Sequence, residues 1–322
     1  MKVEMLTAST VDFDELVRLQ RKSFEGVADP DQLEDVQTPE YYRWKYTLAG
    51  GDARIAQIRN DSGELVAMNS AFPLTLTNGD RTTRGWQSCD TATHPSARGK
   101  GYFLKCLSAL KETFTEGEVF FGYPNANSTR GFTKFGWQKI STLQPFAGIV
   151  PPLPAPPNIR RVDRFGPKQD DLARRLAGSG RIMIQRSAAY MNDRYCSPNR
   201  PLYTAFIYEE AGEGFQGFVI ARPLSIYRMH LCLVVDCQAT SPGIVRQLLS
   251  QIGHWGRGQR LFLALTMNSV TKPLSLVSSG LIPIPNRLSP RPLILMGQAI
   301  GSTAQAFLDQ KWAAYVGDWD GF

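Results

Sequence analysis

Residues 94–103 read HPSARGKGYF and combine the residue types that hold a phosphate group. Gly99 and Gly101 allow the backbone to fold tightly, so that several N–H groups point at one place. Arg98 and Lys100 add the positive charge that attracts a pyrophosphate. An ordinary surface turn is the alternative, because four such residues are weak evidence by themselves. The elements on either side of the segment favour a phosphate-binding loop over an ordinary surface turn.

A strand and a helix are expected around this segment. Residues 81–93 are expected to form a strand, and Pro95 stops it just before the turn. The stretch over residues 102–114 carries apolar side chains on one helical stripe, at Phe103, Leu104, Leu107, Leu110 and Phe114. A helix that begins here adds its positive dipole end and its unpaired N–H groups. The setting therefore predicts a phosphate-binding loop.

Hydrophobic periodicity and turn residues give the other elements of the first half. We expect helices over residues 9–24 and 127–136, and strands over residues 54–61, 62–77, 118–124 and 137–141.

The second half repeats the order of the first. TPEYYRWKY at residues 38–46 has a counterpart in SAAYMNDRY at residues 187–195, and SCDTAT around Asp90 resembles VVDCQAT around Asp236. A helical stretch, a strand and a closing glycine follow in both halves. We interpret this as an internal duplication of one α/β unit. The alternative is coincidence between two ordinary α/β domains.

A proline-rich connector separates the two halves. Five prolines fall between Pro151 and Pro157, and they favour an extended, semi-rigid chain. The 322 residues suit two domains. We therefore expect a first domain over residues 1–145, a linker over 146–160 and a second domain with a C-terminal tail over 161–322.

Composition limits the classes of function. The net charge of +7 favours a phosphorylated partner, but the basic residues are scattered, so we expect no nucleic acid. Five cysteines without CxxC spacing and three histidines without clustering argue against a disulfide framework and against a metal site. No apolar run is long enough to span a membrane, and acidic residues interrupt the N-terminal stretch, so a soluble cytoplasmic protein is expected.

The loop resembles the signature of the GNAT acyltransferase superfamily, Q/R-x-x-G-x-G/A, which holds the pyrophosphate of an acyl-coenzyme A. Here Arg98 to Phe103 read RGKGYF, and Phe103 departs from the small residue of the pattern. A second landmark of the family also fits, because Asn125 precedes the pair Gly136 and Trp137 by 11 positions. The resemblance covers residues 1–145 well and extends weakly through the second half.

The resemblance implies an α/β (α+β) fold of two GNAT-like units, each a mixed, mostly antiparallel sheet flanked by helices. It implies acyl-CoA as the co-substrate, without a metal, and an amine acceptor. The residues it implies for acyl-CoA binding are Ala92, Thr93, Arg98, Gly99, Lys100, Gly101, Tyr102, Phe103, Asn125 and Asn127. For Asn125 and Asn127 the alternative is a role in the turn and the helix N-cap.

The second unit lacks the signature. It reads ATSPGIVRQ at residues 239–247, with Gly243 alone and no basic pair before the helix. We therefore expect a single acyl-CoA site in the first unit. The degenerate second unit is expected to be a scaffold or to shape the acceptor pocket.

In the implied reaction an amine attacks the thioester directly, which requires a base, an oxyanion donor and a proton for the thiolate. The family position of the donors corresponds to the backbone N–H groups of Ala92 and Thr93. Asp90 is the first candidate for the base, and the alternative is a carboxylate tied to a neighbouring strand or to Arg84. The tyrosine that the family often uses as the acid is absent, because residue 132 is Phe, so Tyr123 is its substitute.

The predicted function is transfer of an acyl group, acetyl by default and longer as an option, to a primary amine of a small molecule, amino sugar or peptide. A non-catalytic module that binds CoA is the alternative. A nucleotide-binding protein ranks last, because the GxxxxGK[ST] pattern is missing. The end of the chain, KWAAYVGDWDGF, is expected either to pack between the units or to dock on the surface.

Overall fold

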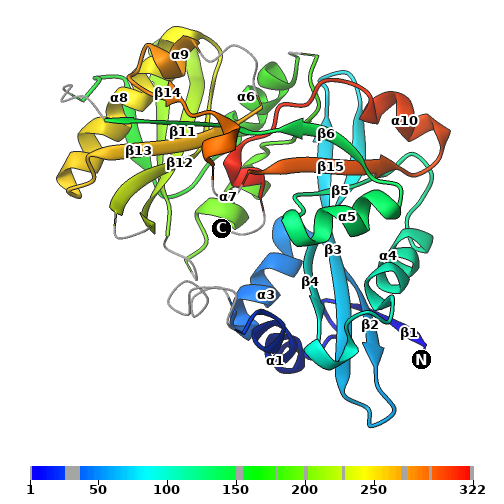
Figure 1. Ribbon diagram of the computed structural model, residues 1–322. Coiled ribbons are helices and arrows are strands. Elements are labelled where there is room, and N and C mark those ends of the chain that lie inside the picture. Colours follow the sequence, from blue (N-terminus) through cyan, green and yellow to red (C-terminus); the bar gives the residue numbers. More distant parts are fainter. Residues whose placement is uncertain are drawn as a thin grey trace.

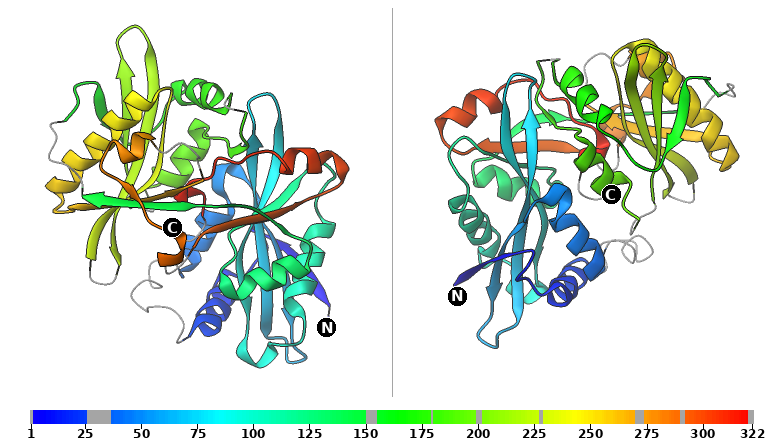
Figure 2. Two further views of the ribbon diagram at one scale, coloured as in Figure 1. Left: turned by 45° about the horizontal axis from the view of Figure 1, so that its top comes forward. Right: turned by 180° about the vertical axis from the view of Figure 1, so that it is seen from behind.

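The computed structural model describes residues 2–25, 37–149, 155–178, 180–198, 202–226, 229–269, 274–289 and 292–319. Two sheets lie side by side, each with its own helices (Figures 1 and 2). Every strand pair is antiparallel except two, β4 with β5 and β12 with β13, in the described part of the chain. The predicted α/β class, with two mixed, mostly antiparallel sheets, is confirmed.

The first sheet has the order β1-β2-β3-β4-β5-β15-β6 in the described residues, and β9 pairs with β3. Its strands are β1 (Val3–Thr7), β2 (Arg54–Arg59), β3 (Leu65–Thr77), β4 (Thr82–Thr93), β5 (Val119–Gly122), β6 (Gln138–Thr142), β9 (Met183–Ile184) and β15 (Ile294–Ala299).

The second sheet has the order β14-β7-β13-β12-β11-β10-β8 in the same part of the chain. Its strands are β7 (Gln144–Ile149), β8 (Ile159–Val162), β10 (Thr204–Glu210), β11 (Gly214–Ile226), β12 (Met229–Ala239), β13 (Leu263–Asn268) and β14 (Ile282–Pro283).

The helices are α1 (Phe13–Phe24), α3 (Pro39–Tyr46), α4 (Tyr102–Glu112), α5 (Ala126–Lys134), α6 (Lys168–Ala177), α7 (Ala188–Tyr195), α8 (Pro242–Gly258), α9 (Leu274–Val277) and α10 (Ser302–Leu308). Short 3-10 turns are η1 (Leu48–Gly50), η2 (Pro95–Ala97), η3 (Asn286–Leu288) and η4 (Val316–Asp318).

Two strands change sheets. β7 follows β6 directly in the chain, yet it pairs with β13 and β14 of the second sheet. In exchange, β15 from the far end of the chain fills the place between β5 and β6 of the first sheet. The division at residues 146–160 stays a prediction, and these two strands cross it. Of the connector's prolines, Pro151, Pro152 and Pro154 lie outside the described residues.

The duplicated helices α3 and α7 begin in the same way. The hydroxyl of Thr38 accepts the N–H of Tyr41 at 3.2 Å, and the hydroxyl of Ser187 accepts the N–H of Tyr190 at 3.2 Å. A side-chain oxygen at this position satisfies one of the amides that a helix leaves unpaired at its start. Local sequence thus fixes where both helices begin.

One hydrophobic core joins the two units, and each unit has a second core of its own. The shared core contains Tyr46 and Phe72 of the first unit together with Phe218 and Val235 of the second. A separate cluster lies beneath α4 and another beneath α8. α4 and α8 therefore cover corresponding faces of the two sheets.

Candidate functional site

The predicted phosphate loop curls into the start of α4. Gly99 and Gly101 have φ angles of +79° and +73°, which a residue with a Cβ atom rarely adopts. Apart from each glycine and its two chain neighbours, no heavy atom of the described residues lies within 4 Å of the place where a side chain of either glycine would begin. The Cβ side of both glycines is therefore open.

The amides of this loop are available to a ligand. Within the described residues, the N–H groups of Gly99, Lys100 and Gly101 donate to no backbone or side-chain acceptor. Gly101 is the N-cap of α4 and has no side chain that could cap it. Amides that converge at a helix N-terminus can bind a diphosphate.

The two basic side chains of the loop differ in how firmly neighbouring residues hold them. Arg98 donates from Nη2 to the carbonyl oxygen of Ser23 at 2.9 Å, so α1 holds part of its guanidinium. Lys100 is exposed. Lys100 is thus the cation that can adjust to an anion in front of the loop.

Phe103, which departs from the family signature, packs away from the loop. Its ring lies edge-on to that of Phe132 with 5.1 Å between the centroids. A Cβ atom on Gly131 would lie 2.5 Å from Cε1 of Phe103, so α5 has a glycine where the large ring approaches. Phe103 therefore joins α4 to α5, and Tyr102 beside it is buried beneath α4.

β4 and β5 part next to the loop. They pair in parallel from Gly85 with Val119 to Ser88 with Gly122, where β5 ends while β4 continues to Thr93. β4 stays paired with β3 on its other edge. The backbone of β4 beyond Ser88 thus has one edge without a β5 partner.

The direction of the amides separates the two predicted oxyanion donors. The N–H of His94 donates to the carbonyl of Val66 on β3 at 2.8 Å. Since amides alternate between the edges of a strand, Ala92 also faces β3, and Thr93 faces the edge that β5 leaves open. The geometry favours Thr93 of the two.

Asp90 lies in a β-bulge and is bound to a buried lysine. Its Oδ1 atom lies 2.9 Å from Nζ of Lys45 on α3, and its φ angle is +48°. Arg84, one of the two partners considered for Asp90 in the structural alternative, lies 3.5 Å from Glu118, just before β5. Sequence reasoning missed Lys45, which lies in the segment YYRWKY.

Asn125 and Asn127 mark the start of α5. The side-chain Oδ1 of Asn125 accepts the N–H groups of Asn127 and Ser128, each at 3.0 Å. Asn125 therefore serves as the N-cap. Tyr123 is half-buried between β5 and α5 and packs against the shared core. Roles of these three residues toward a ligand stay predictions.

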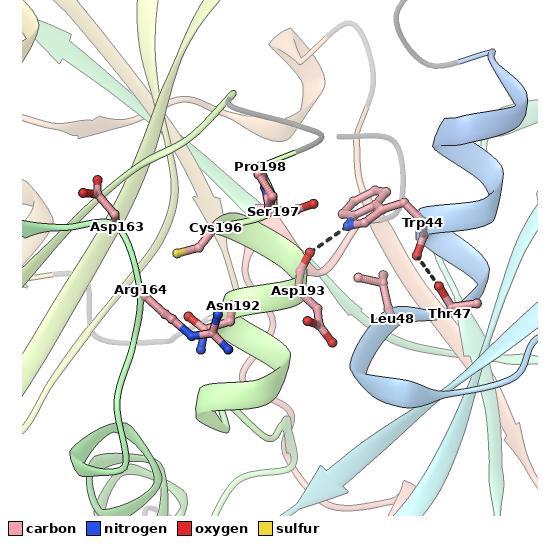
Figure 3. A pocket seen from close by; sticks show the side chains of 10 residues that line it. All are labelled: Trp44, Thr47, Leu48, Asp163, Arg164, Asn192, Asp193, Cys196, Ser197 and Pro198. Carbon is pink, nitrogen blue, oxygen red and sulfur yellow. Dashed lines mark hydrogen bonds between the residues drawn. The ribbon is translucent and has the colours of Figure 1, made fainter.

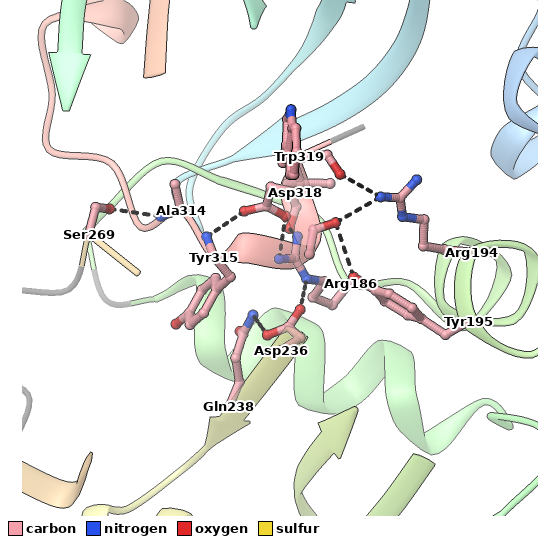
Figure 4. Close-up of polar contacts among 12 residues, drawn as sticks. Arg186, Arg194, Tyr195, Asp236, Gln238, Ser269, Ala314, Tyr315, Asp318 and Trp319 are labelled. Carbon is pink, nitrogen blue, oxygen red and sulfur yellow. Dashed lines mark hydrogen bonds and ion pairs between the residues drawn. The ribbon is translucent and has the colours of Figure 1, made fainter. Parts of the chain in front are cut away.

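The chain end packs between the units. The carbonyl oxygen of Asp318 accepts a hydrogen bond from Nε2 of Gln87 on β4 at 2.8 Å. The carboxylate of Asp318 lies 2.5 Å from Arg186, which also contacts Asp236 at 2.6 Å (Figure 4). Arg194 binds the carbonyl oxygens of Gly317 and Trp319. Of the two sequence-based options, docking on the surface is wrong for the described part of the tail.

This ion triad is buried. Burial alone would lower the pKa of the Arg186 guanidinium, but the carboxylates of Asp236 and Asp318 outweigh it and raise that pKa well above its usual value. Burial raises the pKa of Asp318, against the attraction of Arg186. The triad holds η4 against β12 as a fixed part of the structure.

One cavity between the units lies apart from the loop. Its volume is about 270 Å³, and Figure 3 shows Trp44 and Leu48 on one side and Asn192, Asp193 and Cys196 on the other. None of the predicted site residues lines it. Within the described chain, no group of His, Cys, Asp or Glu side chains is suited to a metal ion. No described helix is both long and apolar enough to cross a membrane.

Comparisons with known proteins find a similar domain and a similar fold. Residues 4–140 match the family model of the acetyltransferase (GNAT) domain. No curated protein matches the chain.

Solved structures resemble nearly the whole chain. A probable N-acyltransferase from Enterococcus faecalis has a TM-score of 0.65 at 14% identity, over 94% of this chain and 73% of its own. A GCN5-related N-acetyltransferase from Anabaena variabilis has a TM-score of 0.66 at 13% identity, over 93% and 73%. The N-myristoyltransferase of Saccharomyces cerevisiae with bound myristoyl-CoA has a TM-score of 0.58 at 12% identity, over 92% and 82%. At these identities the likeness shows the fold alone. Residues 4–140 thus match the acetyltransferase (GNAT) domain model, and nearly the whole chain shares its fold with these solved structures.

Proposed function

We propose that this protein is an acyl-CoA-dependent N-acyltransferase that binds its acyl donor at residues 98–103. The open amides of Gly99, Lys100 and Gly101 at the start of α4 carry this proposal. Lys100 adds a cation at the same place. These groups fit the diphosphate of coenzyme A, since both charge and hydrogen-bond donors converge there.

The gap beside β4 suits the extended arm of the donor. β5 ends at Gly122, opposite Ser88, while β4 continues to Thr93. Acyl-CoA, when bound, supplies a thioester as the electrophile. We place its carbonyl oxygen near the amide of Thr93, which would donate to the negative charge that develops on that oxygen.

The reaction replaces a carbon–sulfur bond by a carbon–nitrogen bond, and one proton leaves the nitrogen while another joins the sulfur. The nitrogen of a neutral primary amine bonds to the acyl carbon, and the carbon–sulfur bond breaks. The amine loses a proton to a base or to water, and the leaving thiolate takes one up, from Tyr123 or from water. The acceptor is an amine of a small molecule, amino sugar or peptide, and acetyl is the default acyl group.

Two measurements test the function. Mass spectrometry of the purified protein should find co-purified acyl-CoA. Incubation with acetyl-CoA and a panel of amines should release free thiol at a rate that depends on the amine. Binding of CoA without thiol release for any amine would favour the non-catalytic binding module, and absence of both would refute the proposal.

A further inference from the structure

The ion pair of Lys45 and Asp90 lies at the point where β4 changes register. The two side chains are 1% and 11% exposed. We propose, on the basis of the acyltransferase function above, that this pair positions the catalytic strand by fixing which backbone amide of β4 faces the thioester. In this assignment Lys45 is a positioning residue, and the carboxylate of Asp90 is its anchor and not the proton acceptor.

The backbone of Asp90 needs such an anchor. A φ angle of +48° is unfavourable for a residue with a Cβ atom, and surrounding contacts must maintain it. Lys45 holds the carboxylate, and Nε2 of Gln20 donates to the carbonyl oxygen of Asp90 at 2.8 Å. Two helices, α1 and α3, therefore hold the residue from outside the sheet.

The bulge at Asp90 decides the direction of the amides that follow it. Cys89 lies opposite Ser70 and Ala92 lies opposite Met68, so two residues of β4 face a single residue of β3. One extra residue turns every later amide to the other edge of the strand. The open edge therefore receives the N–H of Thr93, which would face β3 without the bulge.

The side chains around the bulge favour an anchoring role. Asn69, the residue opposite the bulge, is fully buried and contacts Thr91, and it accepts a hydrogen bond from Ser88 at 3.2 Å. Burial, with the charge of Asp90 adding to it, raises the pKa of Tyr42 and Tyr46 well above the usual value, so both phenols stay neutral. The charge that Asp90 meets from α3 is thus that of Lys45.

The second unit supports the same assignment. Asp236 occupies the place of Asp90 beside a register shift in β12, and it too is held by a buried cation, Arg186, at 2.6 Å. The described segment 239–247, at the place of the glycine loop, has Gly243 alone and without a positive φ angle. A carboxylate that is paired with a buried cation beside a register shift therefore also occurs in a unit where no acyl transfer is expected.

The first test is Lys45→Met. We expect kcat to fall by about 10- to 100-fold, since a displaced donor loses its alignment, while the KM for acetyl-CoA changes by less than about threefold because the loop is intact. Lys22→Met is the matched control, because Lys22 forms an exposed ion pair with Glu25 at 2.8 Å. An unchanged kcat in the Lys45 variant would overturn the proposal.

A second substitution in that background separates the anchor from a base. Glycine adopts a φ angle of +48° without strain, so adding Asp90→Gly to Lys45→Met should raise kcat again and leave the shape of the pH profile unchanged. If Asp90 were the proton acceptor, the same substitution would lower kcat further and remove a titration from the profile. The two interpretations thus predict changes of opposite sign.

Backbone hydrogen exchange tests the anchoring role of the ion pair without a measurement of catalytic activity. In the protein without acyl-CoA, Lys45→Met should speed exchange of the backbone amides at residues 91–94, and Lys22→Met should not. If the native protein releases no thiol with any amine, the proposed function fails, and the exchange result still judges the anchor. Equal exchange in both variants would refute it.

Discussion

The helices α4 and α8 occupy the same place in the two units, but they begin differently. α4 begins behind Gly101, which has no side chain that could cap the helix. α8 begins behind Ser241, whose hydroxyl accepts the N–H of Ile244 at 3.3 Å, and Pro242 removes a further donor. The two helices thus differ in whether a side chain caps the first turn, and we propose that a ligand takes this role at α4.

The second unit also differs from the first in its contact with the end of the chain. The chain end reaches it through the triad of Arg186, Asp236 and Asp318. In the first unit, the acid at the corresponding place holds Lys45 of its own α3. The comparison suggests that one unit keeps a site and the other holds the structure together, and four variants test this division.

Arg186→Met should give the largest effect on stability. It leaves two buried carboxylates without their cation, so we expect the free energy of unfolding to fall by about 3–5 kcal/mol in urea denaturation. Arg174→Met is the control, because Arg174 forms an exposed pair with Asp171 and should cost less than about 1 kcal/mol. Equal losses of unfolding free energy in the two variants would mean that the buried triad stabilises the second unit no more than an exposed ion pair does.

Gly101→Glu should remove most of the affinity for CoA. A carboxylate would stand where we place the diphosphate, and we expect a loss of about 100-fold by calorimetry. Gly101→Asn is the control, since asparagine tolerates the left-handed backbone and adds no charge. Unchanged affinity in the Glu variant would contradict the amide cradle.

Lys100→Ala should weaken CoA binding by about tenfold at low salt and by less as the salt concentration rises. The exposed Lys139 on β6 offers a control of equal charge, and Lys139→Ala should leave the affinity unchanged. A matching loss in both variants would indicate a general effect of charge instead of a local contact.

Ser241→Ala should give the smallest change. Loss of the cap on α8 should cost about 1 kcal/mol of stability, measured by thermal or urea unfolding. The affinity for CoA should stay the same. A weaker affinity for CoA in this variant would mean that the start of α8 takes part in binding.

Local signals in the sequence predicted the elements of the first unit well. The helix expected over residues 9–24 is α1, which begins behind Asp12, and the helix after the loop begins at Tyr102. The strands around the loop also lie where alternation and turn residues place them. These features depend on neighbouring residues, and caps, glycines and periodicity record them directly.

Long-range pairings were not predictable in the same way. Nothing in the composition of β15 indicates that it pairs with β5 instead of a strand of its own half. The partner of Asp90 was missed for a similar reason, because Lys45 is far away in the sequence and looks like a surface residue of α3. Only the folded arrangement brings such groups together.

The exchange of β7 and β15 has a consequence for how the protein is made. During synthesis, the first sheet lacks its strand between β5 and β6 until residue 299 has left the ribosome. Contacts this distant along the chain form late and slowly. A fragment that ends within the proline-rich connector would therefore lack the strand between β5 and β6. The missing half, supplied as a separate chain, should restore the complete sheet.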